Sequence, residues 1–182
     1  MLFRSLTAHA NQEIDATIVA ASAAISASSK GQAAALGGSG ADAENRITTR
    51  VEATIDGGGA SGLQANAVTL KALDESTIDA VAVGAALVAA LGSGGGGAAA
   101  VGVSIAQNSI STDLDAAIRN AQVTTRAGDI KIQAVEDARI DATSVAASLA
   151  AASGAIGIAL SGAGAESTND IDARVKAHAD DS

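Results

Sequence analysis

The chain has 182 residues, with one Phe and no Cys, Trp, Tyr or Pro. This composition excludes a disulfide scaffold, a thiolate metal site and an aromatic platform for nucleic-acid bases. The formal net charge of −9 argues against nucleic acid and anionic membranes as partners, because both are bound through clustered Lys and Arg. Only 17% of the residues are charged, which is low for a disordered chain, and the abundance of Ala, Gly, Val and Ile predicts a thin core.

The first residues, Met1 to Ser5, carry no long apolar stretch and no small-residue cleavage site. They therefore predict no signal peptide, and we expect any export signal to lie elsewhere in a longer protein. The absence of Cys is compatible with an extracellular location.

Two landmarks recur along the chain. The tripeptide Ile-Asp-Ala begins at Ile14, Ile78 and Ile140, and each copy is followed by a run of Ala, Val and Ser and then by Gly. The second landmark is an Asn two residues before an Ile, at Asn45, Asn108 and Asn169. Because both landmarks keep their spacing, the sequence predicts a single array over 1–182, a slice through a longer one. Its expected repeats are 6–67, 68–129 and an incomplete third at 130–182.

Alternating apolar residues predict strands within each repeat. Strand-like leads at 6–10, 68–72 and 130–134 open the three units, and Gly128-Asp129 is a turn signal. In the middle unit Val101 and Val103 alternate on one parity, and Ile110 and Leu114 alternate on the other. This change predicts a corner or bulge near Asn108, and the third unit predicts the same near Asn169.

We therefore expect an all-β fold, a parallel β-solenoid of three repeats of about 62 residues with a thin Ala/Gly/Val core. The alternative is an Ala-rich α-helical solenoid, because 78–91 and 140–152 are rich in the best helix former. Frequent β-branched residues and the interrupting glycines favour strands. The pattern leaves open the handedness, and whether each repeat forms one wide turn or two turns of about 31 residues.

The order of these segments resembles a known family. Gly-Asp-Ile-Lys-Ile-Gln-Ala (128–134), Ile-Asp-Ala, an Ala/Gly/Val tract and Ala-Gln-Asn-Ser-Ile (106–110) are similar to repeats of giant bacterial surface proteins, the filamentous-haemagglutinin-like and leukotoxin-type filamentous adhesins. The resemblance covers nearly the whole chain, although 33–36 lacks the Gly-x-Val stretch usual in the family. It implies a secreted β-solenoid at the bacterial cell surface that spaces or displays adhesive parts.

No motif in the chain has a catalytic signature, so we expect a non-catalytic structural module that provides length and display. The expected partners are neighbouring repeats of the same chain or other copies joined end to end, since cut solenoids expose strand edges.

The recurring polar residues are expected to be structural. If one repeat makes one turn, Asn45, Asn108 and Asn169 stack about 4.8 Å apart and share amide hydrogen bonds. A row of Asp15, Asp79 and Asp141 requires solvation or cations, which makes calcium a candidate ligand. The calcium-binding β-roll motif is absent, because Ala98 follows the glycines at 94–97, so we predict a solvated face with no cofactor and no metal site.

The other titratable residues give no catalytic prediction. His9 and His178 lie near opposite ends of the chain, and we expect both to be exposed and to form no metal site or proton relay. Asp113 and Asp115 share one strand face, as the carboxylates of a glycosidase do. The expected counterparts differ, being Arg50 and Arg174 for Asp113 but Glu52 and Asp172 for Asp115. We therefore expect a solvated polar face, also because no Trp or Tyr is present to build a carbohydrate groove.

Two uncharged tracts, 80–112 and 143–165, are long enough to span a bilayer. A self-assembling or membrane-active protein is therefore the alternative function. Membrane insertion is disfavoured because residues 92–97 are Gly apart from one Ser, and large apolar side chains are few.

Overall fold

The computed structural model describes residues 3–57 and 62–180. These residues form parallel strands in stacked sheets and contain no helix, so the β-solenoid is confirmed and the helical solenoid is excluded. The strands are β1 (Phe3–Ala10), β2 (Glu13–Ser28), β3 (Gln32–Asp56), β4 (Leu63–Ala65), β5 (Ala67–Asp74), β6 (Thr77–Gly92), β7 (Gly95–Arg119), β8 (Val123–Thr125), β9 (Ile130–Glu136), β10 (Arg139–Ser153) and β11 (Gly157–Asp180). Met1 and Leu2 of the N-terminal segment, 58–61 of the first repeat and 181–182 of the third lie outside this description.

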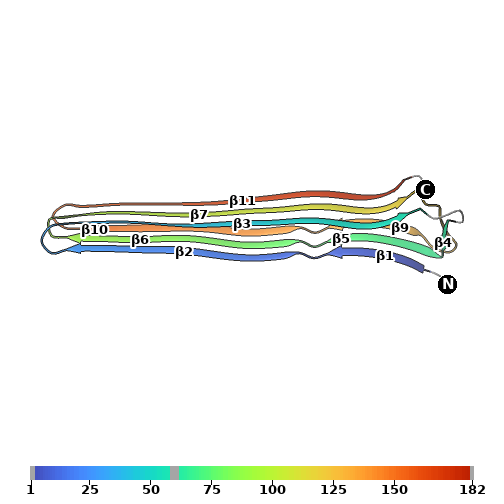
Figure 1. Ribbon diagram of the computed structural model, residues 1–182, viewed down its shortest axis with the longest axis horizontal. Coiled ribbons are helices and arrows are strands. Elements are labelled where there is room, and N and C mark those ends of the chain that lie inside the picture. The colour runs from blue at the N-terminus through green and yellow to red at the C-terminus, as the bar shows by residue number, and fades with distance from the viewer. Residues whose placement is uncertain (1–2, 58–61, 181–182) are drawn as a thin grey trace.

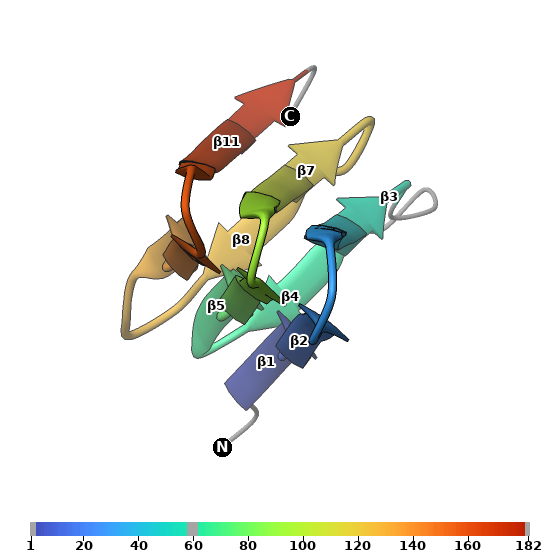
Figure 2. The same cartoon turned by 90° about the vertical axis from the view of Figure 1, so that its left-hand side faces the viewer.

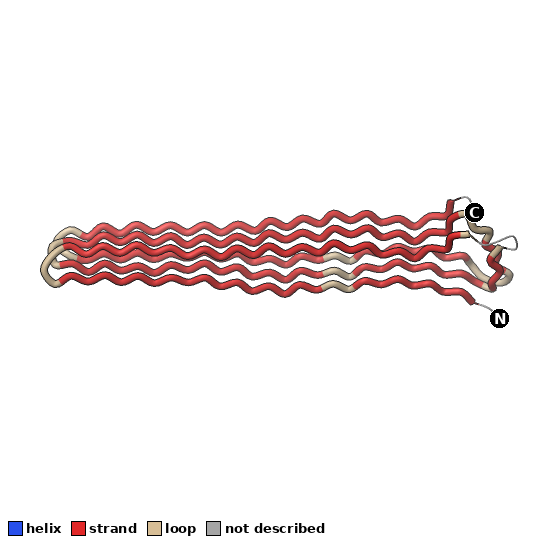
Figure 3. The backbone as a smooth tube through the Cα atoms, in the orientation of Figure 1, coloured by secondary structure: helices blue, strands red, loops and turns tan. Residues whose placement is uncertain are grey.

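Each repeat makes one wide, flat turn. The chain runs out along β1 and β2, reverses in a tight turn at 29–31, and returns along β3, and the next two repeats follow the same path (Figures 1 and 3). The three tight turns lie at one end of the elongated molecule and both termini lie near the other (Figure 1). A repeat therefore forms one turn rather than two shorter ones.

Two long layers result from this path. The outgoing sheet consists of β1-β5-β9 followed by β2-β6-β10, and the return sheet is β3-β7-β11. The end-on view shows the two layers facing each other (Figure 2). All pairs are parallel and in register, so that Ile14, Ile78 and Ile140 lie side by side.

Charge divides the molecule along its length. We define the turn half as the strand segments and tight turns at 16–41, 80–104 and 142–165, which are aligned by the strand register. Lys30 is the only charged residue in these segments. The rest of the molecule, towards the termini, is called the terminal half.

The core between the sheets is thin, and it differs between the two halves. In the terminal half it contains large residues, among them Leu70, Ile78, Ile110 and Leu114, which are fully buried. In the turn half the core cluster consists of alanines and one valine: Ala33, Ala35, Ala86, Val88, Ala90, Ala98 and Ala100.

Glycine permits the close approach of the sheets in the turn half. A Cβ at Gly84 would lie 2.2 Å from the carbonyl oxygen of Val103, and a Cβ at Gly102 would lie 2.5 Å from that of Ala147. No side chain fits at these distances. Ser104 adds a bond between the layers, because its hydroxyl donates to the carbonyl oxygen of Ala82 over 2.7 Å.

The predicted corner near Asn108 is wrong. Strand β7 runs unbroken through Asn108, and β11 runs unbroken through Asn169. Even-numbered residues of β7 face the core along its length, while Val101 and Val103 point outward and are 53% and 39% exposed. The change of parity arises because the closely spaced sheets admit mostly small residues inside, with Val88 as the largest of the cluster, so most large apolar residues of the turn half lie outside.

Candidate assembly surfaces

Three asparagines form a ladder inside the terminal half. Asn45 Nδ2 donates to Asn108 Oδ1, and Asn108 Nδ2 donates to Asn169 Oδ1, each over 2.8 Å. Strand register aligns the three side chains, and Asn45 and Asn108 are buried. The amides satisfy one another in the core and bind each coil to the next, as the repeat spacing predicts for one turn per repeat.

The recurring aspartates lie on the outer surface, not in the core with the asparagines. Asp15, Asp79 and Asp141 are adjacent in the register of β2, β6 and β10, and all three are exposed on the outer face of the outgoing sheet. Asp141 accepts a hydrogen bond of 2.8 Å from Arg139 Nε. Within the part of the chain that the structure describes, no group of three or more His, Cys, Asp or Glu side chains is arranged to hold a metal ion.

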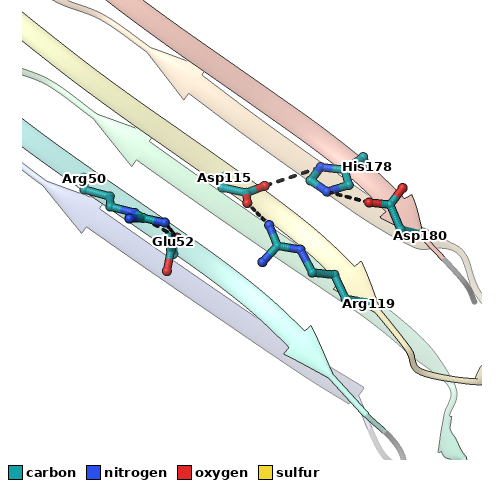
Figure 4. Close-up of polar contacts among 6 residues, drawn as sticks. All are labelled: Arg50, Glu52, Asp115, Arg119, His178 and Asp180. Carbon is teal, nitrogen blue, oxygen red and sulfur yellow. Dashed lines mark hydrogen bonds and ion pairs between the residues drawn. The ribbon is translucent and has the colours of Figure 1, made fainter.

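A cluster of charged residues links β7 to β11 on the outer face of the return sheet (Figure 4). The Asp115 carboxylate is paired with Arg119 and lies 3.4 Å from His178 Nδ1, and His178 Nε2 lies 3.1 Å from Asp180. Because the side chain of Asp115 is only 12% exposed, its partners compensate the lost hydration of the carboxylate. The cluster therefore joins two coils through the contacts of His178 with Asp115 and Asp180.

Two expectations about these residues are wrong. His178 is not exposed, because its side chain retains 28% of its accessible surface between the two aspartates. The register places Lys176 rather than Asp172 beside Asp115, while Glu52 is its neighbour on the other side, as expected. Arg50 bonds to Glu52, and this hydrogen bond raises the pKa of the guanidinium (Figure 4).

An acidic pair that the sequence pattern does not reveal consists of fully buried Asp74 and half-buried Glu136. Asp74 is fully buried, and neither of its carboxylate oxygens has a hydrogen-bond partner among the described residues. Its neighbour in the register is Glu136, whose Oε1 accepts a bond of 2.5 Å from Thr112. Burial raises the pKa of Glu136, and the charges of Asp74 and Asp137 add to the rise, while the bond from Thr112 opposes it.

The stack of coils has an open face. Along β11, the residues that align with core positions of β7 are exposed, among them Ile171 and Val175 at 46% and 44%. The equivalent residues of the middle coil, Ile110 and Leu114, are fully buried because strands cover them from both sides. A further coil on β10 and β11 would cover this apolar row in the same way.

The asparagine ladder is open at the same place. Asn169 is exposed, and among the described residues its Nδ2 donates to no acceptor. Asn45 likewise donates to Asn108, and its Oδ1 receives no bond from the described residues. The ladder thus ends in an acceptor on one side and a donor on the other, which is the arrangement that continues from coil to coil.

No family model, no curated protein and no solved structure matches this chain. Within residues 3–57 and 62–180, no helix is long and apolar enough to cross a membrane.

Proposed function

We propose that this chain is a structural module of a large surface filament or adhesin, in which coil stacks on coil to provide length and display. The module is not an enzyme. It acts outside the cell or on the bacterial surface, as its resemblance to filamentous-haemagglutinin-like repeats implies. The single observation that supports this function most strongly is the open face of β11. There, among the described residues, the apolar core positions are uncovered, and the Asn169 amide has a free donor that another coil could bind.

Stacking follows from the chemistry of that face. Unpaired strand edges recruit further strands through their backbone N–H and C=O groups. Covering Ile171 and Val175 removes apolar surface from water, at about 25 cal/mol per Å². The asparagine ladder adds register specificity, because a coil shifted by one residue would place its asparagine on the outer face.

The test replaces a core-facing residue of β11 with a charge. In Ile171→Lys the ammonium would be buried by an incoming coil, whereas in the matched control Thr168→Lys it points outward on the same strand. We expect the light-scattering mass of the natural chain and of Thr168→Lys to keep rising with concentration. The mass of Ile171→Lys should level off at a small oligomer. Fibre diffraction of the natural chain should show the strand spacing of about 4.8 Å along the filament.

Equal masses for the three chains at every concentration would contradict the proposal. Circular dichroism of each variant shows whether the β structure is retained, and therefore whether a change in mass reflects the surface rather than unfolding.

A further inference from the structure

The turn half has an apolar outer face on the outgoing sheet. Side chains that alternate with the core positions of β2, β6 and β10 line up in rows across the three coils. Four of these rows are Val19/Val83/Val145, Ala21/Ala85/Ala147, Ala23/Leu87/Leu149 and Ile25/Ala89/Ala151. They contain no polar atom beyond the backbone, and the large side chains are exposed, with Val19 at 66%, Ile25 at 74% and Leu149 at 60%.

The shape of this face is complementary to that of a second copy. A shallow hollow of about 450 Å³ follows the alanine row and is bounded by Leu87 and Leu149. Rows of large side chains on either side of a row of alanines form ridges beside a groove. Two such surfaces interdigitate when one is turned around, as in the dry interfaces between paired sheets.

The face is also large enough for a stable contact. The turn half of β2 is thirteen residues long (16–28), so its outer face on the three strands measures about 40 Å by about 15 Å, and full overlap of two copies would bury roughly 1,200 Å² in total. The four apolar rows, at 19–25 of β2, supply about half of this area. This reaches the lower end of specific protein interfaces, and its lack of charged groups resembles an interface core.

Charge determines the orientation of the two copies. Every charged residue except Lys30 belongs to the terminal half, which therefore carries a formal charge of −10, while Lys30 places one positive charge in the first tight turn. Antiparallel strands place the two acidic halves at opposite ends, whereas parallel strands would superimpose them. With the twofold axis between the Ala21 and Ala23 rows, Asp15 lies as far from the axis as the turn at 29–31, so Lys30 of one copy meets Asp15 of the other.

We propose that a second copy of this chain packs antiparallel on the outer face of β2, β6 and β10 in the turn half. The twofold axis runs along the stacking direction, so both solenoids can add coils in the same direction. Lateral pairing is thus a second interface, independent of the stacking of coils.

The first experiment uses Ile171→Lys as the background, so that coil stacking does not obscure lateral pairing. Ala85→Lys places an ammonium in the middle of the alanine row. The matched control Ala99→Lys makes the same change on the outer face of the return sheet, in the same coil, and both alanines are half-buried. Sedimentation velocity should show a dimer for the background and for Ala99→Lys. For Ala85→Lys the dissociation constant of the dimer should be at least roughly tenfold higher.

The second experiment tests the orientation by exchanging charges in the same background. Lys30→Glu should weaken the dimer because the new carboxylate faces Asp15, and Lys30→Glu with Asp15→Lys should restore it. A parallel dimer would not respond in this reciprocal way.

Several results would overturn the proposal. These are a monomeric background chain, equal effects of Ala85→Lys and Ala99→Lys, or an absence of rescue by the charge exchange. Flotation of the background chain with phosphatidylcholine vesicles, abolished by Ala85→Lys, would assign the face to lipid instead. A dimeric background with the same mass as the natural chain would leave lateral pairing intact and contradict only the coil stacking.

Discussion

The two halves of the molecule bury opposite kinds of residue with the same backbone. In the terminal half, large side chains such as Leu70 and Leu114 lie between the sheets, and most charged residues lie outside, with buried Asp74 as an exception. In the turn half, Ala and Gly lie between the sheets, and Leu36 and Leu149 lie outside at 78% and 60% exposure. The comparison teaches that the size of the core residues sets how closely the layers approach, and that a close approach transfers the large apolar residues to the surface.

The largest expected effect comes from widening the turn half. Gly84→Val places a Cβ where the Val103 carbonyl oxygen lies 2.2 Å away, and that oxygen is backbone and cannot move aside. We expect the free energy of unfolding to fall by about 4 kcal/mol, or the chain not to fold. The matched control is Gly40→Val, since a Cβ at Gly40 meets nothing within 4 Å, and it should be nearly neutral. Urea denaturation followed by circular dichroism measures both, and equal losses would contradict the close approach.

Replacing a leucine with alanine should destabilise the fold far more in the terminal half than in the turn half. Leu114→Ala removes a fully buried side chain of the terminal half and should destabilise the fold by about 3 kcal/mol. Leu36→Ala makes the same change at an exposed position of the turn half and should cost less than about 0.5 kcal/mol. Thermal unfolding of the two variants provides the comparison. Similar melting temperatures would mean that both leucines are buried to the same degree.

Removing the central asparagine tests the ladder. Asn108→Ala deletes one donated and one accepted hydrogen bond and leaves the amides of Asn45 and Asn169 without their neighbour. We expect a loss of about 2 kcal/mol. Gln107→Ala, at the exposed position beside it, is the control and should change stability little. A neutral Asn108→Ala would show that the ladder does not hold the coils together.

The smallest effect depends on pH. Because the pKa of Glu136 is raised, the folded state holds its proton more tightly than the unfolded state, so this residue's contribution to stability falls as pH rises above about 4.3. Asp74 and Asp137 repel the ionised form, and Thr112 donates to it. Glu136→Gln should therefore be more stable than the natural chain at pH 7, and the two should converge on acidification. Denaturation curves at several pH values test this, and a constant difference between them would contradict it.

The repeat could be predicted from the sequence because one turn per unit brings identical landmarks together. The spacing of Asn45, Asn108 and Asn169 is sufficient to predict a ladder, since only register is needed. The inward and outward faces of the turn half were harder to predict. Val101 and Val103 follow the alternation of a strand, but the rule that large apolar residues point inward fails where the layers are close.

The acidic pair of Asp74 and Glu136 could not be predicted for a related reason. The sequence around Asp74, Leu-Asp-Glu-Ser, has the composition of a solvent-exposed turn. The residue is nevertheless buried because its parity continues that of Leu70 and Ala72. The usable signal was the acidic residue at the equivalent position of the next repeat, Glu136.

The flatness of each coil determines the height and width of a long array. Every repeat of about 62 residues adds only about 4.8 Å along the stacking direction, whereas its strands extend about 80 Å across it. Three coils are therefore several times wider than they are tall. Growth by stacking produces a broad blade with two large walls, and about two coils must be synthesised for each nanometre of height. Length therefore requires many coils, and each added coil widens the wall area on which other parts can be displayed.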